Sequence, residues 1–307
     1  NIKHWFNVSS ISPIDGRYKN SVSELRVYFS EQALMRHRVM VEVKYLLALV
    51  KHKSFQKTRP LNKKTLGSLE SLYVDFSAKD FKQIKKIEEK TNHDVNAVVV
   101  FISEKLKNLG RKDLVPLVHF GLTSEDINNT AYSLMTKGAV DKIMIPSVKN
   151  VLQELKKLAK KTRSLPMLSL THGQPATTTT LGKELAVFIS RTERELLLIK
   201  KIKLLAKFSG ATGSYAAHKV AFPLFSWSSF SKKFIKGLGL EQSPLSTQVE
   251  PGDSLAALLP AFVRINNIFS DFSLDMWLYI SRNIFVQKNV VGEVGSSTMP
   301  HKINPIF

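Results

Sequence analysis

Apolar residues recur at helical spacing along most of this 307-residue chain, and no convincing run alternates with the period of two that marks a half-buried strand. Several of the helical stretches are about 25 residues long or more, well above the usual length of about 11–12. The stretches with the clearest helical spacing are residues 25–50, 63–74, 77–106, 123–163, 181–208 and 254–285. The pattern therefore predicts an all-α fold, an elongated bundle of long helices.

Local sequence signals are expected to determine where these helices begin, break or bend. Ser21–Glu24 has the composition of a capping box ahead of the first helix. The polar quartet Thr91–Asp94 interrupts the third stretch, and such an interruption needs a physical cause. Pro146 is expected to kink or interrupt the fourth stretch, because proline lacks the N–H that a helix interior uses. Residues 165–180 and 210–251 are mostly without a helical period.

A non-periodic connector at residues 113–120, which contains Pro116, separates two regions of the chain. The length of 307 residues is comfortable for two domains. We therefore expect a smaller helical N-terminal domain at residues 1–112 and a central long-helix bundle at residues 113–307.

The composition excludes several classes of protein. The chain contains no cysteine, which excludes a disulfide framework, a thiolate metal site and a cysteine nucleophile. No apolar run approaches the roughly 18 residues that a membrane-spanning helix needs. The segment Asn1–Trp5 lacks the apolar core of a secretory signal. These observations predict a cytoplasmic protein with no membrane partner.

The charge balance is unusual, with 45 basic and 25 acidic side chains and a formal net charge of +20. Such an excess suits a nucleic-acid-binding protein. The basic residues are spread over the whole chain, however, and many lie in amphipathic stretches such as Lys79–Lys90 and Lys156–Lys161. Solvated helix faces explain these stretches, and attraction of a polyanionic small substrate fits the excess as well as DNA does.

Residues 120–130 form the first of three irregular segments with more polar groups than folding requires. Thr123, Ser124, Glu125 and Asp126 have the composition of a helix start, with acidic residues in the first turn. One interpretation is a helix cap and nothing more. The functional interpretation is that hydroxyls and free N–H groups at a helix start bind a carboxylate.

Residues 171–177 form the second segment, and His172 is its titratable group. An imidazole titrates near neutrality, so it can give or take a proton at physiological pH. Gly173 allows close approach of the backbone, and Pro175 restricts the chain. A structural histidine remains the commoner alternative for any single His.

Residues 292–305 form the third segment, in which two glycines precede Ser296 and Ser297, and Lys302 and Asn304 follow. The order of residues differs from a P-loop and from a Gly-x-Ser-x-Gly nucleophile elbow. Lys302 supplies a cation that can offset negative charge on a substrate. A flexible linker explains the segment as well as a catalytic loop does.

Taken together, the three segments resemble the shared regions of the fumarase/aspartase superfamily, in the expected order. Residues 295–305 resemble its Gly-Ser-Ser-x-Met-Pro-x-Lys-x-Asn-Pro motif. Within the superfamily, residues 12–18, 91–95 and 171–177 resemble the adenylosuccinate lyase family in its longer bacterial form. The resemblance implies the elongated all-α bundle of that superfamily. It also implies that a C-terminal third, present in family members, is absent from this sequence.

The resemblance implies a β-elimination that splits adenylosuccinate into AMP and fumarate. It implies the same release of fumarate from the succinylated aminoimidazole carboxamide ribotide of purine synthesis. By the same resemblance, His172 is the general acid and Ser296 is the general base. A serine hydroxyl is a very poor base at neutral pH, so the pocket must stabilise anions strongly. Lys302 and backbone N–H groups of the Gly292–Ser297 loop are candidates for that task.

The resemblance also implies roles in binding a succinylated purine nucleotide, with no metal and no organic cofactor. The implied substrate-binding residues are Arg17, Tyr18, Asn92, His93, Asp94, Thr123, Ser124, Gln248, Lys302 and Asn304. Arg17 and Tyr18 would contact the phosphate, because a bidentate guanidinium suits that group. Thr123 and Ser124 would bind a succinyl carboxylate. His93 either assists proton transfer or only orients the substrate.

Geometry gives an expectation about assembly. At ~1.5 Å per residue, the stretch from Thr123 to Arg163 would span roughly 60 Å if it stayed helical. One copy would then struggle to bring the first two segments together. The resemblance implies a homotetramer with active sites shared between subunits, which satisfies this constraint. A sharp bend at Pro146 would weaken the argument.

Two alternatives stay open. Another fumarate-releasing lyase, such as argininosuccinate lyase, is the nearest one, and the Ser12–Tyr18 and Thr91–Asp94 segments argue against it. A basic helical nucleic-acid-binding protein is the alternative from a different class. It predicts binding that weakens steeply with salt, and no turnover.

Overall fold

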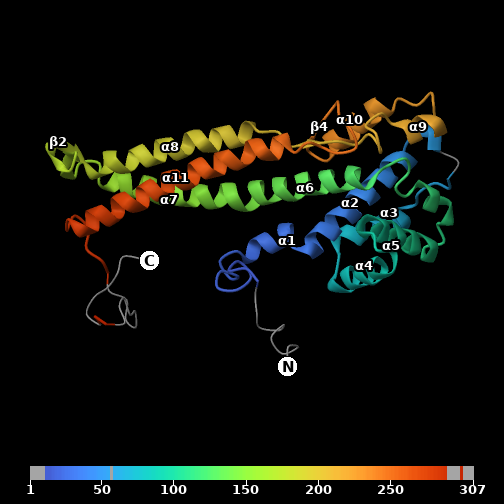
Figure 1. The fold of residues 1–307 in the computed structure, drawn as a ribbon, viewed down its shortest axis with the longest axis horizontal. Coiled ribbons are helices and arrows are strands. Elements are labelled where there is room, and N and C mark those ends of the chain that lie inside the picture. The colour runs from blue at the N-terminus through green and yellow to red at the C-terminus, as the bar shows by residue number, and fades with distance from the viewer. Residues whose placement is uncertain (1–10, 56–57, 289–297, 300–307) are drawn as a thin grey trace. The chain divides into compact units, whose positions relative to one another are not determined.

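The structure is a computed structural model that describes residues 11–55, 58–288 and 298–299 (Figure 1). The predicted all-α class is confirmed, since the described strands form only two short two-stranded ladders. The helices are α1 Arg26–Phe29, α2 Glu31–Val50, α3 Lys63–Val74, α4 Ala78–Thr91, α5 Asp94–Asn108, α6 Ser124–Ala139, α7 Ile145–Lys161, α8 Leu181–Lys201, α9 Ala216–Ala221, α10 Trp227–Gly237 and α11 Asp253–Ser281. The strands are β1 Pro166–Thr171, β2 Gln174–Thr180, β3 Leu205–Ala206 and β4 Glu241–Gln242. Short 3-10 or π segments are η2 Ser23–Leu25, η3 Lys53–Phe55, η4 Lys112–Leu117 and η5 Val140–Met144.

The chain divides into two compact units. The first comprises residues 1–147 and 203–255, and the second comprises residues 148–202 and 256–307. The domain boundary expected after residue 112 stays a prediction. None of the helices in the described part of the chain is both long and apolar enough to cross a membrane.

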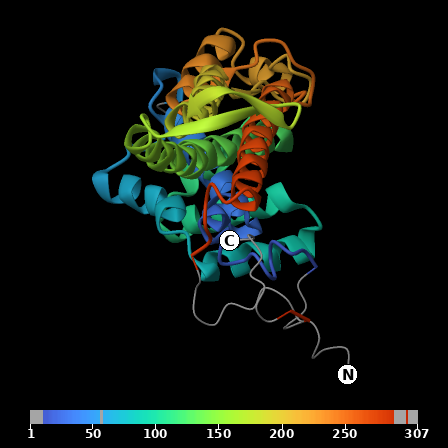
Figure 2. The same cartoon turned by 90° about the vertical axis from the view of Figure 1, so that its left-hand side faces the viewer.

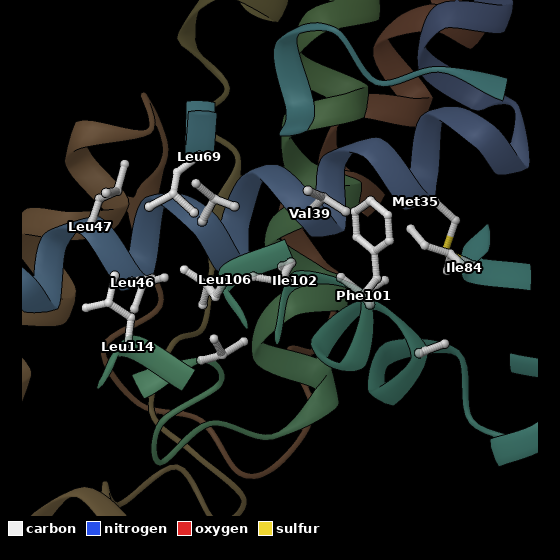
Figure 3. Close-up of a cluster of buried hydrophobic side chains, with 14 residues drawn as sticks. Met35, Val39, Leu46, Leu47, Leu69, Ile84, Phe101, Ile102, Leu106 and Leu114 are labelled. Carbon is white, nitrogen blue, oxygen red and sulfur yellow. The ribbon is translucent and has the colours of Figure 1, made fainter. Parts of the chain in front are cut away.

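Helix α2 is the centre of the hydrophobic core of the first unit (Figure 3). It is buried around most of its circumference, which is typical of a helix that other elements surround. Side chains of α3, α4, α5 and η4 pack against it. The labelled members of this cluster are Met35, Val39, Leu46, Leu47, Leu69, Ile84, Phe101, Ile102, Leu106 and Leu114.

The start of the first long helix differs from the prediction. No capping box forms at Ser21–Glu24, where the chain makes turns and the 3-10 segment η2. Ser30 begins α2 instead, because its backbone is extended and its Oγ accepts a hydrogen bond from the N–H of Ala33 at 3.1 Å. The same hydroxyl donates to the carbonyl of Arg26 at 2.7 Å, which joins α1 to α2.

The predicted interruption at Thr91–Asp94 is confirmed. Asn92 ends α4 in the left-handed conformation, with a φ of 49°, and His93 caps α5. The interruption expected near Pro146 takes the form of the π segment η5, which separates α6 from α7, and Pro146 lies in the first turn of α7 directly after it. A π turn holds one more residue than an α turn, which accommodates the proline ring and its missing N–H.

Residues 165–180 form an antiparallel hairpin of β1 and β2 in the second unit, where the sequence predicted no regular structure (Figure 2). Most residues of both strands are exposed. A strand without a buried face does not need alternating apolar and polar residues, so periodicity could not reveal it. The threonines of β2 have the β-branched side chains that favour strands.

Helix α8 ends at Lys201, earlier than the predicted Phe208. Leu205 and Ala206 form β3 instead, which pairs in parallel with β4 in the first unit. Ion pairs join the helices of the second unit, from Lys156 of α7 to Glu193 of α8 and from Arg191 of α8 to Asp271 of α11.

Candidate active site

The amino-terminal end of α6 is the best-defined part of the candidate site. Thr123 is the cap of this helix, and its N–H donates to Asp126 Oδ2 at 2.9 Å. Thr123 and Ser124 are half-buried. Gln248, although 125 residues further along the chain, places its Nε2 3.5 Å from Thr123 Oγ1. The structure therefore brings together the residues expected to bind a carboxylate, at a helix end that favours negative charge.

A buried ion pair anchors this helix end. Asp126 and Lys207 are both fully buried, with Lys207 Nζ 2.8 Å from Asp126 Oδ1. The carboxylate also accepts hydrogen bonds from the N–H groups of Ser209 and Gly210, at 2.9 and 3.0 Å. Asn129 adds two hydrogen bonds with the backbone of Lys207, at 2.8 and 3.0 Å. Residues 207–210 are thus fixed against the first two turns of α6.

Gly213 connects this anchor to the segment that carries Gln248. Its φ is +75°, and a Cβ there would lie 2.0 Å from the carbonyl oxygen of Ser246. Only glycine allows this backbone approach. Ser209 Oγ lies 3.1 Å from Ser246 Oγ, which adds a second link between the two segments. The position of Gln248 therefore depends on a glycine that sequence analysis did not single out.

The second group of expected residues lies between α4 and α5. His93 Nδ1 accepts a hydrogen bond from the N–H of Asn96 at 3.2 Å, so the ring caps α5. This contact assigns the ring's proton to Nε2 in its neutral form. Asp94 pairs with Arg38, with Nη2 2.5 Å from Oδ2. Burial by itself raises the pKa of Asp94, but the charge and hydrogen bond of Arg38, together with the N–H of Val95, outweigh burial and hold the pKa below its usual range.

Arg38, which sequence analysis missed, links these two groups of residues. Its side chain is only 3% exposed. Besides Asp94, it contacts Asn128 of α6, with Nε 2.9 Å from Oδ1. One guanidinium on α2 therefore ties the start of α5 to the first turns of α6. No motif marks Arg38, because it lies inside a helix next to Arg36 and His37 and acts only through tertiary contacts.

Arg17 and Tyr18 lie in the turns before η2. Both side chains are exposed, and the Arg17 guanidinium lies 5.8 Å from the centre of the Tyr18 ring. The N–H of Tyr18 donates to the carbonyl of Pro13 at 2.9 Å. Within the described part of the chain, no hydrogen bond or ion pair joins these two side chains to the other expected site residues. Their phosphate-binding role stays a prediction.

His172 occupies the tip of the β1–β2 hairpin in the second unit. Thr171 pairs with Gln174, which leaves His172 and Gly173 as a two-residue turn. Their φ values are 52° and 71°, as in the type I′ turns that match the twist of a hairpin. A positive φ is uncommon for a residue other than glycine. The imidazole is exposed, so a ligand that binds at the tip of the hairpin can reach it.

Three expected site residues, Ser296, Lys302 and Asn304, lie outside the described residues, so their predicted roles remain predictions. Among the described residues, no group of three or more histidine and carboxylate side chains is arranged to hold a metal ion. The expectation that the reaction needs no metal and no organic cofactor also stays a prediction.

Comparisons with known proteins agree on one family. A family model described as lyase matches residues 16–307. An adenylosuccinate lyase of Dictyostelium discoideum is 48% identical over 307 residues, and the match covers 98% of this chain and 66% of the relative. An adenylosuccinate lyase of Escherichia coli strain K12 is 43% identical over 301 residues, with the same coverage. The chain thus spans just under two thirds of the length of these relatives.

Comparison with solved structures shows which fold the chain shares. A β-carboxy-cis,cis-muconate cycloisomerase of Acinetobacter calcoaceticus matches with a TM-score of 0.66 and 23% identity, covering 84% of this chain and 57% of that one. A fumarate lyase of Mesorhizobium matches with a TM-score of 0.67 and 19% identity at the same coverage. At this identity the likeness shows the fold alone. Since the family model spans nearly all of the sequence, the chain belongs to the lyase family.

Proposed function

We propose that the full-length protein releases fumarate from adenylosuccinate and leaves AMP. The observation that carries this proposal is the identity of 41–48% to adenylosuccinate lyases along almost the whole chain. The same β-elimination would release fumarate from the succinylated aminoimidazole carboxamide ribotide. We assign the activity to the full-length protein because the chain spans only 66% of its relatives.

The proposed reaction breaks a C–H and a C–N bond, so it needs a base for the carbon and an acid for the nitrogen. The base removes a proton from the succinyl carbon beside a carboxylate, and the acid protonates the nitrogen that leaves. His172 suits the acid role, since it is an accessible imidazole on a defined turn. Ser296 is the proposed base. Lys302 and backbone N–H groups would stabilise the negative charge that grows on the carboxylate as the proton leaves.

The proposed substrate is a succinylated purine nucleotide, an anion with two carboxylates and a phosphate. The α6 end with Thr123, Ser124 and Gln248 supports carboxylate binding, because a helix start and its hydroxyls attract an anion. Asn92, His93 and Asp94 would line the nucleotide site, with Asn304 near the succinyl group. Arg17 and Tyr18 would hold the phosphate. The net charge of +20 favours the approach of such a substrate.

The proposed assembly is a homotetramer with shared active sites. Exposed apolar side chains on α11 support an association of copies. Leu259, Val263, Leu274 and Trp277 are each more than half exposed. At 100° per residue these four positions fall within about 60° of one another around the helix, so they form one stripe. An apolar stripe of this kind is a surface that association buries. The cytoplasmic location expected from the sequence stays a prediction.

The test is a turnover assay on the full-length protein. Ultraviolet absorbance follows the loss of adenylosuccinate, and product analysis identifies fumarate and AMP. We expect cleavage of adenylosuccinate and no cleavage of argininosuccinate. Cleavage of argininosuccinate alone would replace the proposed substrate by its nearest alternative. Salt-sensitive binding of DNA without turnover of either compound would favour the nucleic-acid-binding alternative.

A further inference from the structure

One face of α2 carries three polar side chains that each reach the candidate site. Arg38, Glu42 and Tyr45 stand at positions i, i+4 and i+7, so they share one side of the helix. Arg38 contacts Asp94 and Asn128, as described above. The Tyr45 hydroxyl donates to the carbonyl of Phe120 at 2.8 Å. Glu42, in the middle of the three, contacts His119.

Glu42 is an unusual residue for the interior of a helix. Its side chain is fully buried, and its Oε1 lies 2.5 Å from Nδ1 of His119. Its other oxygen, Oε2, is buried without a hydrogen-bond partner. Desolvation of a carboxylate is costly, and a buried ion pair repays that cost only when the remaining lone pairs are satisfied. The Glu42–His119 pair is therefore expected to contribute little to stability, which points to a role in binding or catalysis.

His119 sits at the entrance to α6. Its backbone φ is 58°, and its carbonyl accepts from the N–H of Leu122 at 3.2 Å, so a tight turn leads from His119 to the cap Thr123. The side chain is 21% exposed. Among the described residues, no acceptor forms a hydrogen bond with Nε2 of His119, and this atom is not fully buried. Nε2 is therefore open to a ligand.

The charges around His119 favour its cationic form. Burial by itself lowers the pKa of His119, but the hydrogen bond and charge of Glu42, with the charge of Asp126, outweigh burial and raise the pKa above its ordinary value. Glu42 faces the ring from α2, and Asp126 acts from α6, where Lys207 offsets part of its charge. An imidazolium beside the positive end of α6 makes a site for a negative group.

We propose that Glu42 is a positioning residue, which holds the His119 ring as a cation so that its Nε2–H meets an anionic oxygen of the substrate beside Thr123 and Ser124. This inference rests on the proposed function, which supplies the anionic substrate. The anionic oxygen belongs either to a carboxylate or to the phosphate, and the experiment below distinguishes these two sources.

The first test is Glu42→Gln in the full-length protein, with kcat/KM measured against pH. Glutamine keeps the size of the side chain and removes its charge, so His119 loses its proton at lower pH. We expect kcat/KM to fall about tenfold or more at neutral and alkaline pH, and the deficit to narrow as the pH is lowered, because acid returns the proton to His119. A deficit equal at every pH, or no deficit, would overturn the proposal.

The matched control is Glu104→Gln. Glu104 is an exposed carboxylate on α5 in the same unit, hydrogen-bonded to Gln83 at 3.2 Å. This variant removes one negative charge without touching His119, so its pH profile should follow the wild type. Should Glu42→Gln fail to fold, Glu42→Asp keeps the charge but withdraws the carboxylate by one methylene. Glu42→Asp should show a smaller deficit in kcat/KM than Glu42→Gln, and this deficit should also narrow as the pH is lowered.

Product inhibition identifies the anion. If His119 holds a carboxylate, Glu42→Gln should raise the inhibition constant of fumarate about tenfold and leave that of AMP unchanged. If it holds the phosphate, the constant of AMP should rise instead. Unchanged constants for both products would overturn the proposal. A His119→Asn variant should lose the same interaction, and adding Glu42→Gln to it should cause little further loss, because the two residues act as one unit.

An NMR titration of the His119 ring separates this inference from the proposed function, because it needs no turnover. We expect the pKa of His119 to be lower in Glu42→Gln than in the wild type. An unchanged pKa would overturn the inference even in an active enzyme. A wild-type protein that releases no fumarate would overturn the proposed function, and the titration would still judge the role of Glu42.

Discussion

Three buried or partly buried histidines of the first unit differ in proton affinity because their neighbours differ. Burial lowers the pKa of His37, although its hydrogen bond to the carbonyl of Ala33 opposes the change. Glu42 raises the pKa of His119 against the effect of burial. Burial, with Asp126 and Lys207 acting in opposite directions, lowers the pKa of His218 to about 4. One residue type therefore supplies a cation at one place and a neutral ring at another.

His218 should make the protein less stable in mild acid. Below its ordinary pKa of 6.5, the unfolded chain takes up a proton at His218, whereas the folded chain stays neutral there down to about pH 4. The folded state then binds fewer protons, so stability falls as the pH drops from about 6.5 to about 4, by up to about 3 kcal/mol. Urea unfolding of the full-length protein across this range measures the slope.

The matching variant is His218→Gln, which cannot titrate. His218 is buried, and its Nε2 lies 3.2 Å from the Tyr45 hydroxyl, so glutamine keeps a polar group there. The variant starts from a lower stability at neutral pH but should lose less of it on acidification. Equal slopes for the wild type and the variant between pH 6.5 and 4 would show that His218 does not titrate as its burial implies.

Sequence patterns identified site residues at helix ends but not those inside helices. Thr123 and His93 follow recognisable patterns, a capping sequence and a polar break, and the structure places both at helix starts. Arg38 and Glu42 lie within α2, and Lys207 directly follows β3. Their roles arise from partners far away in the sequence, so no local pattern marks them.

Among the secondary-structure elements, the long helices were predictable and the hairpin was not. Helix α3 covers the predicted residues 63–74, because its apolar spacing and its Asn62 cap agree. The hairpin has no buried face, so its residues carry no period. Its one local signal is His172–Gly173, since a glycine preceded by a residue that tolerates positive φ favours a two-residue turn.

Gly182, in the first turn of α8, should be intolerant of any side chain. A Cβ there would lie 2.4 Å from the carbonyl oxygen of Ala159, in the last turn of α7, and 2.6 Å from Cα of Arg163, just after that helix. Backbone cannot move aside as a side chain can. We expect Gly182→Ala to lower the free energy of unfolding by about 1–3 kcal/mol, measured by urea unfolding.

Gly67 provides the opposite control within a helix. It lies inside α3, and a Cβ there would meet nothing within 4 Å. Gly67→Ala should therefore raise the free energy of unfolding by roughly 0.5–1 kcal/mol, since alanine restricts the unfolded chain and favours the helix. A destabilised Gly67→Ala together with a neutral Gly182→Ala would contradict the packing described for both helices.

For the whole molecule, the sequence predicted an all-α lyase fold and the order of its motifs. The sequence could not show which segments, far apart along the chain, contact one another within a compact unit. In the first unit, Gln248 meets Thr123 through Gly213 and Ser246, and α2 holds the starts of α5 and α6. These arrangements depend on packing between residues far apart in the sequence. His172 belongs to the second unit, on its own hairpin.

The central claim is that these motifs form one fumarate-releasing site, shared between copies of the full-length protein. Two variants test it, His172→Ala, which lacks the proposed acid, and Ser296→Ala, which lacks the proposed base. Each alone should lose at least about 10²-fold in turnover and keep the tetramer. The direct measurement is the rate of fumarate release after the two variants are unfolded together and refolded as a mixture, with wild-type protein refolded in parallel as the control.

If each site takes His172 and Ser296 from different chains, about a quarter of the mixed sites contain both intact residues, because the chains associate at random. The account therefore predicts that the mixture recovers about a quarter of the activity of the refolded wild type. A mixture as inactive as each variant alone, beside a wild type that recovers fully, would contradict it.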